Sequence, residues 1–170
     1  MKSKVHIKFG LGAALVAAIL FSIFYFLESQ ENAGAFKWAF ILVMAGGIFM
    51  SCMQYVKVNG KATFGELFSN GFRTTAVIIV IFLAFVMACV TLSPTLKTKI
   101  MNEAAQANAS TPATTEMSDD ALKEQQEHVS AQFIPFLLAG ALLPMLIIGG
   151  VSSALAAMVT KNSNISSSKK

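Results

Sequence analysis

Four long apolar segments, separated by polar ones, dominate the hydrophobic pattern of the chain. They lie at residues 9–27, 38–56, 74–93 and 133–159, and none of them contains a charged side chain. A helix rises about 1.5 Å per residue, so about 20 apolar residues cross a hydrocarbon core of roughly 30 Å. Because a helix satisfies its own backbone hydrogen bonds in lipid, the pattern predicts an all-α, polytopic membrane protein. We expect a single domain over residues 1–170, built as a four-transmembrane-helix bundle.

The composition agrees with a membrane protein. Hydrophobic residues make up 55% of the chain and charged residues 13%. Soluble domains carry roughly 25% charged residues, so this chain lacks the charge to cover a surface that faces water. Both cysteines, Cys52 and Cys89, lie inside apolar segments, which excludes a secreted disulfide framework.

The basic residues predict the orientation in the membrane. With a cytoplasmic N-terminus, nine basic residues lie on the inner side of the membrane and four on the outer side. Basic residues concentrate in cytoplasmic loops, so we expect both termini in the cytoplasm. The net charge of +4 then reflects topology and does not indicate nucleic acid. Ala33-Gly34-Ala35 offers an alternative, a signal-peptide cleavage site, but the first apolar segment exceeds the roughly 7–15 residues of such a peptide.

The loop between the second and third segments predicts a short helix at the cytoplasmic interface. Thr63 and Glu66 have the spacing of a capping box. The apolar residues behind the cap recur at helical spacing, and they are Phe64, Leu67, Phe68 and Phe72. We expect this face to lie in the inner leaflet as an anchor, with a gating or partner-docking element as the alternative.

The two remaining polar segments differ in their expected order. The outer loop, residues 94–132, is the only sizeable aqueous segment, and we expect it to be partly helical. Pro94 suits the first turn of a short helix there. The Ser-rich tail, residues 162–170, is expected to be disordered.

Small residues recur along the apolar segments and predict close helix packing in lipid. The predicted packing residues are Gly10, Ala14, Ala18, Ser22, Gly46, Gly47, Ser51, Gly149, Ser153 and Ala157. Pro144 lies near the middle of the fourth segment and predicts a kink there. A broken helix at that depth either packs against neighbours or lines a substrate site.

No catalytic, cofactor or metal site emerges from the sequence. Ionisable residues inside membranes mark ion pathways and proton relays, and the four segments contain none. His6 and His128 are expected on opposite sides of the membrane, so they cannot share a site. We therefore expect a protein that is not an enzyme and that has no cofactor.

A resemblance to a known family is carried by residues 59–72 (NGKATFGELFSNGF), Pro94, residues 117–120 (MSDD) and residues 149–154 (GGVSSA). On these features, nearly the whole chain resembles the bacterial domain-of-unknown-function family 4199. The resemblance implies four transmembrane helices and a location in the bacterial inner membrane. It implies no reaction.

Two functions remain open at this point. The first is a structural or accessory protein that acts through helix packing with itself or with a membrane-protein partner. The alternative is a small transporter or channel subunit that forms its pathway by oligomerisation, for which Pro144 and Gly149-Gly150 are the motivation. The expected partners are the lipid bilayer and another membrane protein or a second copy. We expect neither nucleic acid nor a known small-molecule substrate.

Overall fold

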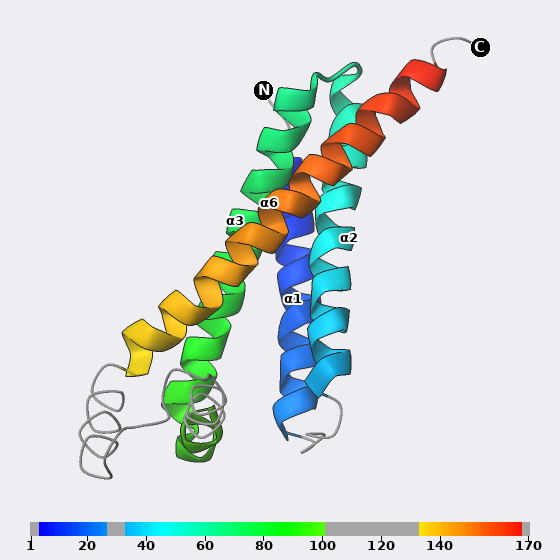
Figure 1. The fold of residues 1–170 in the computed structure, drawn as a ribbon. Coiled ribbons are helices and arrows are strands. Elements are labelled where there is room, and N and C mark those ends of the chain that lie inside the picture. Colours follow the sequence, from blue (N-terminus) through cyan, green and yellow to red (C-terminus); the bar gives the residue numbers. More distant parts are fainter. Residues whose placement is uncertain (1–3, 27–32, 101–132, 168–170) are drawn as a thin grey trace, which may run out of the picture. The chain divides into compact units, whose positions relative to one another are not determined.

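A computed structural model describes residues 4–26, 33–100 and 133–167. Within these ranges the chain is helical apart from short turns, which confirms the all-α prediction. The principal helices are α1 (Val5–Phe26), α2 (Ala33–Asn59), α3 (Phe64–Leu92) and α6 (Phe133–Ser167) (Figure 1). All four are long and apolar enough to cross a membrane, and together they indicate a multi-pass membrane protein.

The chain forms two compact units. The first contains residues 1–85 and 143–170, and the second contains residues 86–142. The second unit includes the end of α3, a helical segment at residues 94–100 and the beginning of α6. At the start of that segment the Leu96 amide lies 3.4 Å from the Ser93 hydroxyl oxygen, to which it donates a hydrogen bond. Pro94 thus occupies the first turn of a helix, where its missing N–H costs little.

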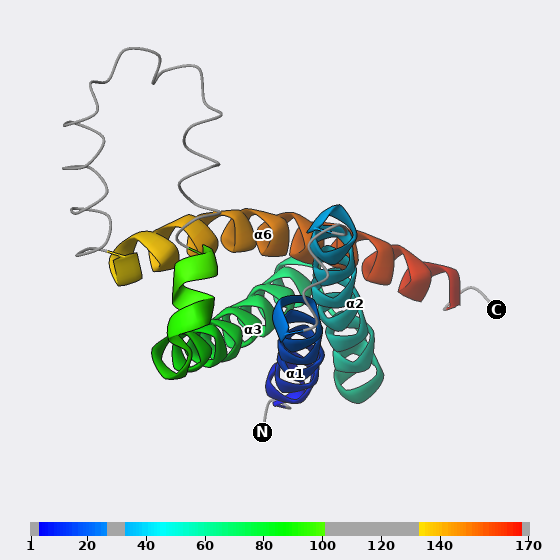
Figure 2. The same ribbon diagram turned by 90° about the horizontal axis from the view of Figure 1, so that it is seen from below.

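Within the first unit, α1 and α6 lie on opposite sides of the pair formed by α2 and α3 (Figure 2). Small residues permit this close packing. A Cβ atom on Gly47 of α2 would lie 2.6 Å from the Ala13 Cβ of α1. A Cβ atom on Gly10 of α1 would lie 2.7 Å from a methyl carbon of Val77 in α3. Each glycine therefore allows α1 to approach a neighbour more closely than any other residue would.

A tight turn joins α2 to α3. Gly60 has a φ of +77°, which other residues adopt rarely, and its amide donates to the Val56 carbonyl over 2.8 Å. At the start of α3 the Thr63 amide donates to the Glu66 carboxylate over 3.0 Å. The Glu66 amide in turn donates to the Thr63 hydroxyl over 3.3 Å. Both hydrogen bonds of a capping box are thus present.

All four helices are longer than their apolar segments, and the extensions of α3 and α6 bear on two of the predictions. α3 runs unbroken from Phe64 to Leu92, so the expected interfacial helix is the first part of the helix that contains the third span. α6 continues to Ser167, past residue 162 where we expected the tail to begin. Residues 151–167 contain neither proline nor glycine, so no strong helix breaker ends α6 before Ser167. Residues 101–132 of the outer loop and 168–170 of the tail lie outside the described residues.

Among the glycines of the described residues, Gly149 of α6 has the least room for a side chain. A Cβ atom there would overlap the side-chain methyl of Thr75 in α3 and would lie 2.8 Å from the Met44 Cε of α2. At the neighbouring Gly150, a Cβ atom would meet nothing within 4 Å. The contact of α6 with α2 and α3 therefore requires glycine at residue 149 but not at residue 150.

Gly149→Ala should lower the free energy of unfolding by about 1–2 kcal/mol, because overpacking costs more than the gain in helix propensity. Gly150→Ala is the matched control and should leave stability unchanged or raise it by up to about 1 kcal/mol. Unfolding in mixed micelles, followed by far-UV circular dichroism as denaturing detergent is added, measures both. Equal stabilities of the two variants would contradict the close contact at Gly149.

Candidate functional site

Buried polar side chains connect α2 to α3. The hydroxyl oxygens of Ser51 and Thr74 lie 2.8 Å apart, and the Asn70 amide nitrogen donates to the Ser51 oxygen over 2.9 Å. The Thr74 hydroxyl donates to the backbone carbonyl of Asn70 over 2.9 Å. With that proton committed, Ser51 is the donor to Thr74. The hydrogen bonds therefore form a closed loop. It runs from the Asn70 side-chain amide to Ser51, from Ser51 to Thr74, and from Thr74 back to the Asn70 backbone carbonyl.

A second pair of hydroxyls lies where α3 meets α6. The hydroxyl oxygens of Thr75 and Ser153 are 3.4 Å apart. Thr75 donates to the Gly71 carbonyl over 3.2 Å, and Ser153 donates to the Gly149 carbonyl over 2.6 Å. Each proton is thus directed to its own helix, so the contact between the two hydroxyls is weak. We use the name polar cluster for Ser51, Asn70, Thr74, Thr75 and Ser153.

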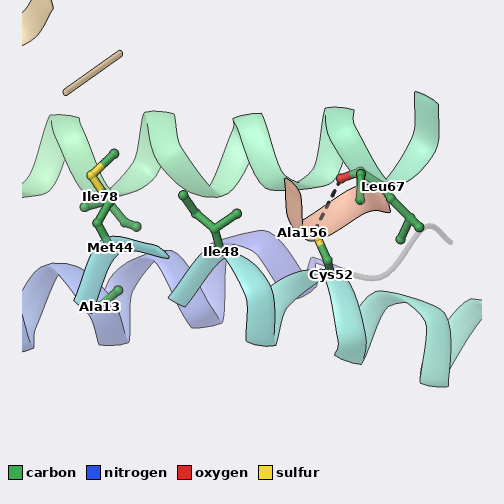
Figure 3. Close-up of a cluster of buried hydrophobic side chains, with 8 residues drawn as sticks. Ala13, Met44, Ile48, Cys52, Leu67, Ile78 and Ala156 are labelled. Carbon is green, nitrogen blue, oxygen red and sulfur yellow. Dashed lines mark hydrogen bonds between the residues drawn. The ribbon is translucent and has the colours of Figure 1, made fainter. Parts of the chain in front are cut away.

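The polar cluster is enclosed by the packed helices. Four of its members are 0% exposed, and Asn70 is 4% exposed. The apolar core beside it consists of Ala13, Met44, Ile48, Cys52, Leu67, Ile78, Ala156 and Ala157 (Figure 3). The Cys52 thiol lies in this core, 3.4 Å from the Leu67 carbonyl to which it donates (Figure 3). Large side chains from α2 and α3 thus meet alanines from α1 and α6.

The spacing of residues on α3 explains why the polar cluster forms. Asn70 and Thr74 are four residues apart, as are Gly71 and Thr75, so both pairs lie on one side of the helix. Gly71 also brings α6 close, since a Cβ atom there would lie 3.0 Å from the Ser153 side chain. Short hydroxyl side chains can then reach across the contact between the helices.

The chemistry of the polar cluster is neutral hydrogen bonding. Its four hydroxyls and one amide carry no charge, and in the described part of the chain no three His, Cys, Asp or Glu residues gather as a metal site would require. An unpaired polar group in such surroundings would cost several kcal/mol, on the order of 2–7. The cluster therefore holds the helices in one register.

Comparison with known families supplies the assignment of the chain. Residues 8–162 match the family described as Protein of unknown function (DUF4199). The chain belongs to this family. The match confirms the resemblance found in the sequence, and it includes every residue of the polar cluster. No curated protein and no solved structure gives a significant match.

In this DUF4199 chain, most of the small residues predicted to pack helices lie inside the first unit. Seven of the ten are buried, and they are Gly10, Ala14, Ala18, Ser51, Gly149, Ser153 and Ala157. Gly47 and Ser22 are half-buried, and the Ser22 hydroxyl donates to the Ala18 carbonyl over 2.9 Å. Gly46 is the exception, because it is exposed and a Cβ atom there would meet nothing within 4 Å.

The residues of the predicted interfacial helix divide between two faces. Phe64, Phe68 and Phe72 stack along α3, with ring centroids 6.1 and 6.2 Å apart. Leu67 does not share this aromatic face, because it is 0% exposed and packs in the apolar core. Adjacent helical residues differ by about 100° in direction, which turns Leu67 away from Phe68 and toward α2.

Sequence reasoning did not find the members of the polar cluster that α3 contributes. From the sequence, Asn70 is only a polar residue within the short interfacial helix, and Thr74 is only the first residue of the third apolar segment. The available signal was the pair of i, i+4 repeats, residues 70–74 and 71–75. Their significance depends on Ser51 and Ser153 lying opposite, and these belong to distant parts of the sequence.

Thr74→Val should lower the free energy of unfolding by about 1 kcal/mol, because it breaks the loop of donors while keeping the shape of the side chain. Thr91→Val is the control, since the Thr91 hydroxyl is exposed and donates only to the Met87 carbonyl in its own helix. The same detergent-unfolding experiment measures both variants. A loss in Thr91→Val as large as that in Thr74→Val would show that the cluster adds no specific stability.

Proposed function

We propose that this DUF4199 protein is a non-enzymatic structural or accessory membrane protein that packs through its helices against a second copy or another membrane protein. The observation that carries the proposal is an exposed apolar stripe on α2 with Gly46 at its centre.

The α2 stripe follows one face of the helix at intervals of three or four residues, and it consists of Trp38, Leu42, Gly46, Met50 and Met53. Its large members are strongly exposed, with Leu42 at 70% and Met50 at 57%. Gly46 lacks a side chain between them and faces open space. Small residues let transmembrane helices approach closely enough for dispersion contacts, so the stripe suits a second helix.

The interior of the first unit supports the same proposal. The other nine predicted packing residues are buried or half-buried within the first unit, and Gly47 and Gly149, for example, make close contacts inside the chain. The hydroxyls of the polar cluster bond to each other and to backbone carbonyls, which suits a rigid scaffold better than a reacting centre. We further propose a bacterial inner-membrane location with both termini in the cytoplasm, from the distribution of basic residues.

Gly46→Leu should reduce the assembled fraction, seen by native mass spectrometry of gently extracted protein, by about tenfold, because a bulky side chain keeps helices apart. Gly12→Leu is the matched control, since Gly12 is also exposed and faces open space, but on α1. It should leave assembly unchanged.

Unchanged assembly in Gly46→Leu would overturn the proposed role of the α2 stripe. Ala14 is also a predicted packing residue, but Ala14→Leu cannot replace Gly46→Leu in this test. Ala14 is 0% exposed, so enlarging it strains the chain's own packing and lowers assembly by unfolding. Far-UV circular dichroism of each variant separates the two causes.

The second candidate function is a small transporter or channel subunit. The observation that favours it is the location of the polar cluster, which places hydroxyl groups inside otherwise apolar helices. Pro144 lies within the same helix as Ser153, and a proline inside a helix frees a carbonyl that can line a path. On this proposal, copies of the chain would assemble around the pathway.

Transport by the purified protein in liposomes tests this second function. Pro144→Ala should change the flux of at least one solute by about twofold or more, because it restores a helix hydrogen bond. Pro135→Ala should not change it, since Pro135 lies in the first turn of α6, where its missing N–H is not needed. The absence of flux for a broad panel of solutes would count against this function.

A further inference from the structure

Positive charge is concentrated at one end of the first unit. This is the end where α1 and α3 begin and where α2 and α6 finish (Figure 1). Six exposed basic residues belong to it, and they are Lys4, Lys8, Lys57, Lys61, Arg73 and Lys161. We call these six residues the basic end.

Arg73 belongs to the basic end although it lies further along α3. Gly10, in the second turn of α1, packs against the carbonyl of Thr74 and the side chain of Val77. This contact sets Arg73 at the level of the first turns of α1. Arg73 therefore lies nearer to the level where α1 begins than to the level where it ends.

Little negative charge balances the basic end. Among the described residues Glu66 is the single carboxylate, and it already accepts hydrogen bonds from the Thr63 amide and hydroxyl. At the other end of α2, Lys37 is the one basic residue described in the first unit. The two ends of α2 thus differ strongly in charge across the described part of this unit.

The stacked aromatic rings of α3 lie at the same end. Phe64 is 38% exposed and Phe72 is 43% exposed, while Phe68 stacks between them. Aromatic side chains favour the boundary between headgroups and acyl chains. Arg73 directly follows Phe72 and Lys61 precedes Phe64 by three residues, so cations flank an apolar surface at this boundary.

We propose that the basic end is a binding surface for anionic phospholipid headgroups. The cations attract the phosphodiester groups, and Arg73 offers the planar, bidentate donors that phosphate oxygens match. The aromatic rings pack among the upper acyl chains of the same lipids. Clusters of basic residues beside membrane spans attract anionic lipids in this way. The proposal does not depend on the α2 stripe, so either can fail without the other.

The test is native mass spectrometry of the full chain from micelles that contain equal amounts of phosphatidylglycerol and phosphatidylcholine. The wild type should retain phosphatidylglycerol in excess. Lys61→Gln should lower the retention ratio about threefold, and the triple variant Lys57→Gln, Lys61→Gln, Arg73→Gln should lower it about tenfold or more. Lys37→Gln is the matched control, because it removes one exposed lysine from the opposite end of α2, and it should retain the wild-type ratio.

Equal retention of the two lipids by the wild type would overturn the proposal, as would an unchanged ratio in the triple variant. Wild-type protein provides a second measurement that needs no variant. Raising the salt concentration from about 0.05 M to about 0.5 M should reduce the excess of phosphatidylglycerol, because salt screens exposed charges. An excess that does not respond to salt would also contradict the proposal.

Discussion

The packing of the first unit depends on the closed loop of hydrogen bonds among Asn70, Ser51 and Thr74. These groups lie in apolar surroundings, where an unmade hydrogen bond would cost several kcal/mol, on the order of 2–7. The loop satisfies each donor only when α2 and α3 are in one relative register. A shift by one residue along either helix would separate the hydroxyls. The hydrogen bonds thus add a directional preference to packing that the close glycine contacts already constrain.

Close approach of the backbones makes that loop possible, and glycine makes the approach possible. Short hydroxyl side chains reach across a helix contact only if the helices nearly touch. Gly71 lets α3 approach α2, since a Cβ atom there would lie 3.2 Å from a methyl carbon of Ile48. Gly149 and Gly71 also bring α6 onto α3, and Gly47 brings α1 onto α2. Because dispersion and hydrogen bonding replace the hydrophobic effect between helices in lipid, these small residues contribute much of the specificity of packing. The α2 stripe and the basic end are among the surfaces that this packing leaves exposed.

The exposed surfaces and the interior therefore favour different interactions. The polar cluster in the interior is uncharged and its hydroxyls are bonded, so it suits a stable scaffold. The α2 stripe is an exposed, uncharged apolar surface, whereas the basic end carries positive charges beside stacked aromatic rings. The two surfaces occupy different residues, and their effects can be separated by substitution.

The sequence by itself determined the helical architecture, because four uncharged apolar segments leave few ways to satisfy a backbone in lipid. It also determined the start of α3, because a capping box is a local interaction between Thr63 and Glu66. Only the tertiary structure decided which small residues face inward. Gly46 and Gly47 are adjacent and chemically identical, yet one faces outward and the other contacts Ala13. The polar cluster likewise required the tertiary structure, because its members come from α2, α3 and α6, and no local pattern reveals which hydroxyls will lie opposite each other.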